Sequence, residues 1–253
     1  MLAVLDLFTE EQPVHAAEEI AGRLKYTRPT GYRYVRELVS AGLLVRCPGG
    51  YALGPRIIEL DWLIRAHDPV LTASGAAVRD LALKTGCDVT QMGLYGERVV
   101  TIRHEPGPEP LRIGFDRGRP MPLFRGAPSK AVLAFLPRAR LERLYRKHHK
   151  RGFAGYAEEM QAIRKAGYSI SIGELDPGKV GIGAPIFRRD RSVAGSICLV
   201  LTSQRYDKAN RELLIEKLLE SAERISEALE PVEPEARPRR KIPESTNHPI
   251  VQK

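Results

Sequence analysis

The most restrictive pattern in this sequence lies between residues 16 and 54, and it begins with two closely spaced helices. In the first, apolar side chains recur at positions i, i+3, i+4 and i+7, which places one apolar stripe along the helix. The stripe consists of Ala17, Ile20, Ala21 and Leu24. Lys25 and Tyr26 interrupt the period. Thr27 is expected to cap the second helix, because its hydroxyl can accept a hydrogen bond from a free N–H of the next turn.

The second helix is expected to bury Val35, Leu38 and Val39 and to expose polar side chains near its start. A helix that enters the major groove of DNA needs such a surface, because arginines reach guanine edges or phosphates and hydroxyls reach phosphates. Gly31 costs about 1 kcal/mol relative to Ala inside a helix. Close approach of the backbone to DNA is one reason to tolerate that cost.

A hairpin is predicted directly after the second helix. Residues 43–46 and 51–53 are short apolar runs on either side of a Cys-Pro-Gly-Gly turn. Helix, break, helix and hairpin together indicate a winged helix-turn-helix, which reads DNA. The residues expected to contact DNA are Thr27, Arg28, Thr30, Gly31, Tyr32, Arg33, Arg36 and Arg46. The alternative from the pattern alone is a small helical unit that docks onto another protein, since helix-turn-helix units also do this.

Three features resemble the IclR family of bacterial transcription regulators. They are the Glu-Ile-Ala run at residues 19–21, Thr30 with Arg33 in the second helix, and the exit from the hairpin, YALGPRIIEL, at residues 51–60. The resemblance extends over residues 1–229. It implies a sequence-specific DNA-binding regulator whose operator affinity is controlled by a small effector bound in a GAF-like domain.

The basic character of the chain is unevenly distributed. The formal net charge is +9, which suits a polyanionic partner. Residues 1–67 nevertheless hold eight Lys or Arg and eight Asp or Glu, so the argument for DNA rests on the arginines of the second helix. The densest basic run is residues 138–151. It is interpreted as a solvated helix face, with contact to DNA phosphates as the alternative.

The remaining elements alternate between helices and strands in an α+β order. Helices are predicted at residues 55–67, 70–85, 127–136, 138–150, 157–166 and 207–229, and strands at 89–95, 98–104, 111–115, 168–172, 180–187 and 193–201. The predicted domains are a winged helix-turn-helix at 1–54, a linker helix at 55–67, an effector-binding domain with an antiparallel sheet at 68–230, and a disordered tail at 231–253.

The family resemblance also implies where an effector would bind. The pocket positions fall at Ala127, Pro128, Ser171, Gly181, Cys198 and Val200. Ser129 and Arg125 flank the start of the helix at 127, whose N–H groups attract an anion. Only two of these pocket side chains are polar, so a carboxylate with an aromatic or longer carbon body is expected. Arg125 could bind it bidentately or could form an ordinary surface pair, and Cys198 is expected to be an inert buried thiol.

Catalysis, metal binding and cofactor binding are not expected. The cysteines include no CxxC pair, the histidines lack metal-ligand spacing, and no nucleotide fingerprint occurs. An enzyme is disfavoured because Cys198 has no activating base in the pattern, while Glu174 and Asp176 suit turn formation. An architectural DNA binder without an effector is the other alternative. No apolar run approaches the ~18 residues of a membrane span, so a cytoplasmic protein with no membrane partner is expected.

The protein is expected to act as a homodimer, with a tetramer on DNA as the alternative. One helix-turn-helix reads only a few base pairs, and paired half-sites multiply the affinity. The apolar helix at residues 55–67 and the first helix, at residues 1–8, are the expected contacts. Relatives in the family normally begin somewhat earlier, so we expect either a start at a late Met or a short first helix, and either would weaken this N-terminal contact.

Overall fold

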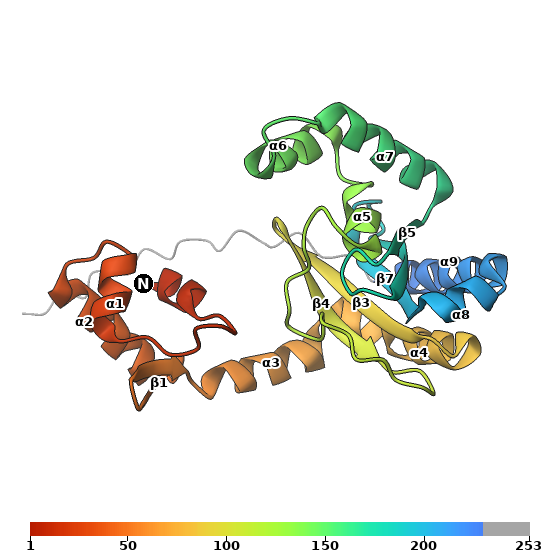
Figure 1. The fold of residues 1–253 in the computed structure, drawn as a ribbon. Coiled ribbons are helices and arrows are strands. Elements are labelled where there is room, and N and C mark those ends of the chain that lie inside the picture. The colour runs from red at the N-terminus through yellow and green to blue at the C-terminus, as the bar shows by residue number, and fades with distance from the viewer. Residues whose placement is uncertain (230–253) are drawn as a thin grey trace, which may run out of the picture. The chain divides into compact units, whose positions relative to one another are not determined.

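The computed structural model describes residues 1–229 of the 253-residue chain, and they belong to two compact units. The first unit is Met1–Thr72, and the second begins at Ala73. In Figure 1 the colours run from red in the first unit to blue at the end of the second. The tail predicted at residues 231–253 lies outside the described residues.

The first unit contains the predicted pair of helices and the predicted hairpin. Its elements are η1 (Leu2–Leu7), α1 (Ala17–Arg23), α2 (Arg28–Ser40), β1 (Leu44–Cys47), β2 (Gly50–Leu53) and α3 (Arg56–His67). The first of these is a 3₁₀ helix rather than an α-helix. The core beneath η1, α1, α2 and β1 consists of Val4, Ala17, Ile20, Val35, Leu38 and Leu44. The apolar stripe of α1 therefore packs as its spacing predicts.

One residue from outside the hairpin also pairs with it, and the sequence pattern did not indicate this pairing. Leu44 pairs with Leu53 and Cys47 with Gly50 in the antiparallel ribbon. His15, just before α1, exchanges two backbone hydrogen bonds of 3.0 and 2.9 Å with Tyr51. A single bridging residue carries no alternating pattern, so sequence periodicity has no means of indicating it.

Thr27 directly precedes α2, as predicted, but its hydroxyl does not cap the helix. It donates instead to Oγ1 of Thr30 at 2.9 Å. The Gly31 N–H donates to the Thr27 backbone carbonyl at 2.9 Å, which is the first regular helical hydrogen bond. The position of the cap was therefore correct and the predicted side-chain hydrogen bond was wrong.

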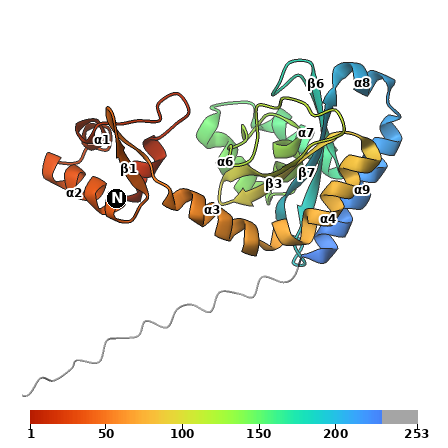
Figure 2. The ribbon, with the colours of Figure 1, turned by 90° about the horizontal axis from the view of Figure 1, so that it is seen from below.

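The second unit is built on a five-stranded antiparallel sheet in the order β4-β3-β7-β6-β5. The strands are β3 (Asp88–Tyr95), β4 (Arg98–Glu105), β5 (Ser169–Ile172), β6 (Lys179–Phe187) and β7 (Val193–Thr202). The helices are α4 (Pro69–Thr85), α5 (Ala127–Leu133), α6 (Arg138–His148), α7 (Phe153–Ala166), α8 (Ser203–Lys208) and α9 (Arg211–Ala228). Figure 2 shows α4 and α9 along one face of the sheet, with α6 and α7 on the opposite side.

Two predicted elements of the second unit are wrong. Residues 111–115 are not a strand, because their backbone does not pair with a neighbouring strand. The N–H groups of Leu111 and Gly114 donate to the carboxylates of Asp88 and Asp176 instead. The predicted helix at 207–229 is two helices, since Asn210 breaks the run and accepts a hydrogen bond from Leu213 N at 3.2 Å as the cap of α9.

Within residues 1–229, none of the helices has the combination of length and apolar character that crossing a bilayer requires.

Candidate functional site

The α2 surface predicted to contact DNA is largely open to solvent. Its exposed members are Arg28, Tyr32, Arg33 and Arg36. Thr30 is half-buried, and the guanidinium of Arg33 lies over the ring of Tyr34, 5.3 Å from its centroid. Arg46 is exposed on β1, opposite Tyr51 in the hairpin. Exposed arginines on a helix and on the adjoining wing are the groups that a winged helix offers to DNA.

Gly31 does not belong to this exposed surface. It is buried against α1, and a Cβ atom added to Gly31 would lie 2.5 Å from the Cβ of Ala21. A glycine is needed here because α1 and α2 approach each other closely, and this packing explains Gly31 without the predicted approach to DNA. Sequence spacing identified the glycine as unusual but could not identify its neighbour, which lies on the other helix.

Glu18 of α1 is a member of this surface that sequence reasoning missed. Its carboxylate accepts a hydrogen bond from the Tyr32 hydroxyl and lies 3.7 Å from Nη2 of Arg28. The hydrogen bond from Tyr32 is the main reason that the pKa of Glu18 lies below its ordinary value. Glu18 thus occupies the position beside Tyr32 and Arg28 that an external anion would take. A DNA phosphate would have to compete with Glu18 for these two side chains.

The second unit contains a partly open cavity beside α5 and the ends of β5 and β6. Its lining residues are Thr90, Ile113, Phe115, Met121, Pro128, Ser171, Glu174, Leu175, Asp176, Lys179, Val180, Gly181, Cys198 and Val200. Of the predicted effector-binding residues, Pro128, Ser171, Gly181, Cys198 and Val200 line the cavity. Arg125, Ala127 and Ser129 are not part of its lining.

Strand register explains why residues distant in sequence meet at this cavity. Gly181 of β6 lies opposite Ser171 of β5 on one side and Val200 of β7 on the other. A Cβ atom added to Gly181 would lie 3.1 Å from Ser171 Oγ and 3.4 Å from both Ala127 Cβ and Cys198 Sγ. Any side chain at position 181 would therefore fill the space between α5 and the sheet.

The N–H groups at the start of α5 are already used by the protein. Gly126 N donates to Glu174 Oε2 at 2.8 Å, and Ala127 N donates to Ser171 Oγ at 2.9 Å. Pro128 has no N–H to offer. The helix start therefore binds an anion as predicted, but the anion is the chain's own Glu174. Few N–H donors remain there for a ligand.

The Glu174 carboxylate also pairs with Lys130 of α5, and this pair fixes the loop between β5 and β6. Lys130 Nζ lies 2.8 Å from Glu174 and 2.9 Å from Glu159 of α7. Partial burial raises the pKa of Glu174, but the hydrogen bond from Gly126 N–H and the pair with Lys130 outweigh it, so the pKa lies below its ordinary value. The carboxylate is consequently ionised and compensated at neutral pH.

Arg125 and Ser129 lie outside the cavity lining, where an effector would not contact them. The guanidinium of Arg125 is exposed and donates to the backbone carbonyl of Glu174. The Ser129 hydroxyl is fully buried and has no hydrogen-bond partner in the part of the chain that the structure describes. The structure therefore does not bring the predicted arginine clamp into the cavity wall.

Cys198 has the environment of an unreactive thiol. It is 1% exposed, and burial raises the pKa of its thiol to about 12. The thiolate, which is the nucleophilic form, is therefore scarce at neutral pH. Among the described residues, no three His, Cys, Asp or Glu side chains are grouped as metal ligands would be.

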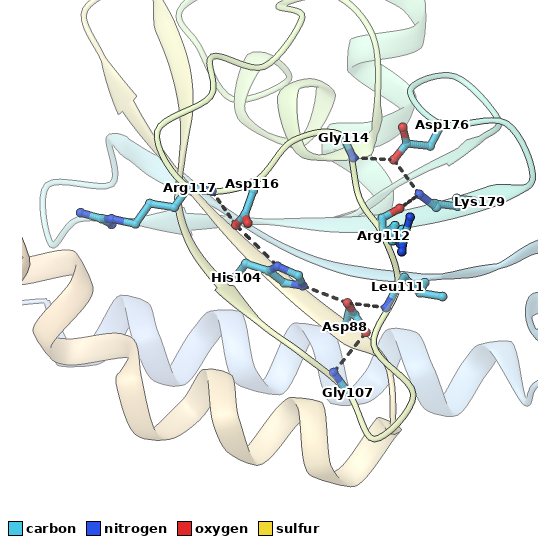
Figure 3. Close-up of polar contacts among 10 residues, drawn as sticks. All are labelled: Asp88, His104, Gly107, Leu111, Arg112, Gly114, Asp116, Arg117, Asp176 and Lys179. Atoms are coloured by element: carbon cyan, nitrogen blue, oxygen red, sulfur yellow. Dashed lines mark hydrogen bonds and ion pairs between the residues drawn. The ribbon is translucent and has the colours of Figure 1, made fainter. Parts of the chain in front are cut away.

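Two loops border the cavity, and Figure 3 shows the polar contacts that hold them. The first is residues 106–119, which we call the lid; it contributes Ile113 and Phe115 to the cavity lining. The second is residues 173–178, the β5–β6 loop. The cavity has about 50 Å³ of free volume, whereas a cavity of about 150 Å³ is known to hold benzene. The lining must therefore move before a ring-sized molecule can enter.

A winged helix-turn-helix with exposed arginines, followed by an α+β unit with a cavity, defines a class of protein: DNA-binding transcriptional regulators. The family description "Bacterial transcriptional regulator IclR C-terminal" matches residues 65–227, and "IclR helix-turn-helix domain" matches residues 1–48. The chain therefore belongs to the IclR family of bacterial transcriptional regulators. Its relatives are regulators and not enzymes.

Similar proteins share both units. The HTH-type transcriptional regulator KipR of Bacillus subtilis is 25% identical over 234 residues, which cover 89% of this chain and 93% of KipR. The crystal structure of an IclR transcriptional regulator from Alicyclobacillus acidocaldarius is 25% identical with a TM-score of 0.74, covering 90% of this chain and 96% of that one. An IclR homolog from Microbacterium hydrocarbonoxydans, complexed with 4-hydroxybenzoate, shares the fold at 20% identity and a TM-score of 0.70, with coverage of 90% and 96%.

Proposed function

We propose that this regulator binds a small organic acid in the cavity of its second unit and that binding changes its affinity for operator DNA. The observation that carries the proposal is the cavity itself. Ser171, Gly181, Cys198 and Val200 come from three adjacent strands and line one mainly apolar cavity. Such a space suits a carbon body, and the few polar groups along it suit one acid group.

An aromatic carboxylate is the effector class that fits this lining best. Apolar side chains supply most of the wall, including Ile113, Phe115 and Met121. The structurally similar homolog complexed with 4-hydroxybenzoate gives a concrete candidate of this class. The ligand alters DNA affinity only through its different affinities for the two states of the regulator.

The proposed DNA contacts are those of α2 and the wing. Arg28, Arg33 and Arg36 are exposed on α2, and Arg46 is exposed on β1. Thr27, Thr30 and Tyr32 would then contact phosphates, with Tyr32 leaving Glu18 to do so. We assign residues 1–54 to DNA binding, 55–67 to the linker and 68–230 to effector binding. We further propose that the protein acts in the cytoplasm as a homodimer, or as a tetramer on DNA.

The test is a ligand screen followed by operator titration. Thermal shift with benzoate, 4-hydroxybenzoate, phenylacetate and succinate identifies binders, and operator affinity is then measured with and without each binder. A coupling of about 1–3 kcal/mol corresponds to a change of about 5- to 150-fold in operator affinity. Operator affinity that stays constant at saturating concentrations of every binder would contradict the proposed function.

A further inference from the structure

Lys179, at the start of β6, is the cation of the cavity, and the sequence analysis did not single it out. Among the described residues that line the cavity, Lys179 is the one with a basic side chain. Arg125 donates to the backbone carbonyl of Glu174 and does not line the cavity. Its side chain is 21% exposed, so its charge acts in a partly desolvated place. Because the donors at the start of α5 are taken, an acid group in this cavity needs another positive partner.

Lys179 connects the β5–β6 loop to the lid. Its Nζ lies 3.1 Å from Asp176 Oδ2 and also donates to the backbone carbonyl of Arg112 in the lid. Asp176 Oδ2 in turn accepts the Gly114 N–H of the lid at 3.1 Å. Figure 3 shows these contacts as one group around Arg112 and Gly114, the part of the lid that we call its tip. We call Asp176 and Lys179, with their two lid partners, the latch.

The base of the lid is held separately and more firmly. Asp88 is 1% exposed and accepts three hydrogen bonds: from His104 Nε2 at 2.9 Å, Gly107 N at 3.1 Å and Leu111 N at 3.2 Å. A buried carboxylate with three donors is costly to disturb, because each lost partner leaves a desolvated charge. The tip of the lid can therefore open at the latch while its base stays in place.

We propose that Lys179 binds the acid group of the effector and that Asp176 is the counter-ion which the effector replaces. This inference rests on the proposed function, because it names the residue that selects the ligand class. An ammonium carries three donors, and the contacts of Lys179 with Asp176 and the Arg112 carbonyl use two of them. An incoming carboxylate takes the third donor and competes with Asp176 for the charge. The latch is then remade around the ligand.

Two substitutions with opposite expected effects test the inference by isothermal titration. The probes are benzoate and 4-hydroxybenzoate, each compared with its neutral carboxamide. Lys179→Gln should weaken carboxylate binding about tenfold or more, the loss expected for a charge-assisted hydrogen bond, and change carboxamide binding less than about twofold. Asp176→Asn should strengthen carboxylate binding several-fold, because it removes the competing charge and keeps an oxygen for Gly114. A merely structural role would weaken binding in both variants.

Arg125→Gln is the matched control, since Arg125 is a nearby cation outside the cavity lining. It should leave carboxylate affinity within about twofold of wild type. Carboxylate binding that is unchanged in Lys179→Gln, that falls in Asp176→Asn, or that is absent for both probes in the wild-type protein overturns the inference. If the carboxylates bind through Lys179 and yet operator affinity never changes, the inference stands and the proposed function fails.

Discussion

At the scale of single residues, Cys198 is the side chain whose size decides how much space the cavity has. Its Sγ lies within 3.4 Å of where a Gly181 Cβ would be, so additional atoms at position 198 can extend only into the cavity. Cys198→Leu should abolish the ligand response and leave operator binding by the ligand-free protein nearly intact. The measurement is operator affinity with and without the ligand, and Cys198→Ala, which keeps the space open, is the control. A full response from the Leu variant would place the ligand elsewhere.

The arginines of α2 give the second prediction at this scale. Arg33 and Arg28 are exposed, and Arg28 is held loosely by Glu18 at 3.7 Å. An arginine that reads a base should contribute about 1–3 kcal/mol and specify one operator position, whereas one that binds phosphate should weaken binding to all sequences alike. Fluorescence titration of Arg33→Ala and Arg28→Ala on operator and scrambled DNA separates the two roles. Unchanged affinity in both variants would exclude α2 as the reading helix.

At the scale of elements, the contact between α1 and α2 depends on Gly31. Gly31→Ala should destabilise the first unit by about 1–3 kcal/mol, the usual cost of overpacking a core, because the new methyl group would meet Ala21. Adding Ala21→Gly to the same chain should restore part of that stability. Thermal unfolding of the single and double variants measures the difference. Equal stability of Gly31→Ala and wild type would mean that the two helices can separate without cost.

Elements with a clear period were predictable from the sequence, and contacts between elements were not. The stripe from Ala17 to Leu24 follows directly from local spacing, and β3 and β7 coincide with predicted strands although both are largely buried on both faces. Apolar side chains also alternate over residues 111–115, but two distant carboxylates accept hydrogen bonds from Leu111 N–H and Gly114 N–H, and no local pattern contains that information. Lys179 escaped notice for the same reason, since its partner in the lid lies 67 residues away.

At the scale of the whole molecule, α3 indicates that the chain does not act alone. The described part of α3 has no buried residue, and it exposes Ile58, Trp62, Leu63 and Ile64. A helix with apolar side chains on several sides is normally covered. Light scattering should show a homodimer, and Ile58→Glu with Trp62→Glu should yield monomers with weaker operator binding. Leu83→Glu changes an apolar residue of α4 that is 77% exposed, and serves as the control. A monomer with full operator affinity would refute the prediction.

The small size of the cavity has a consequence for the rate of binding. Because about 50 Å³ cannot hold a ring, the proposed aromatic effector can bind only after the lining has moved, and the proposed exchange at the latch places that movement at the lid tip. At high concentration the rate of binding therefore stops rising and equals the rate of opening, which for loops of this kind falls in the microsecond to millisecond range. Departure requires the same opening. If the regulator responds to an effector as proposed, it averages the signal over that interval, and shorter fluctuations in effector concentration leave operator binding unchanged.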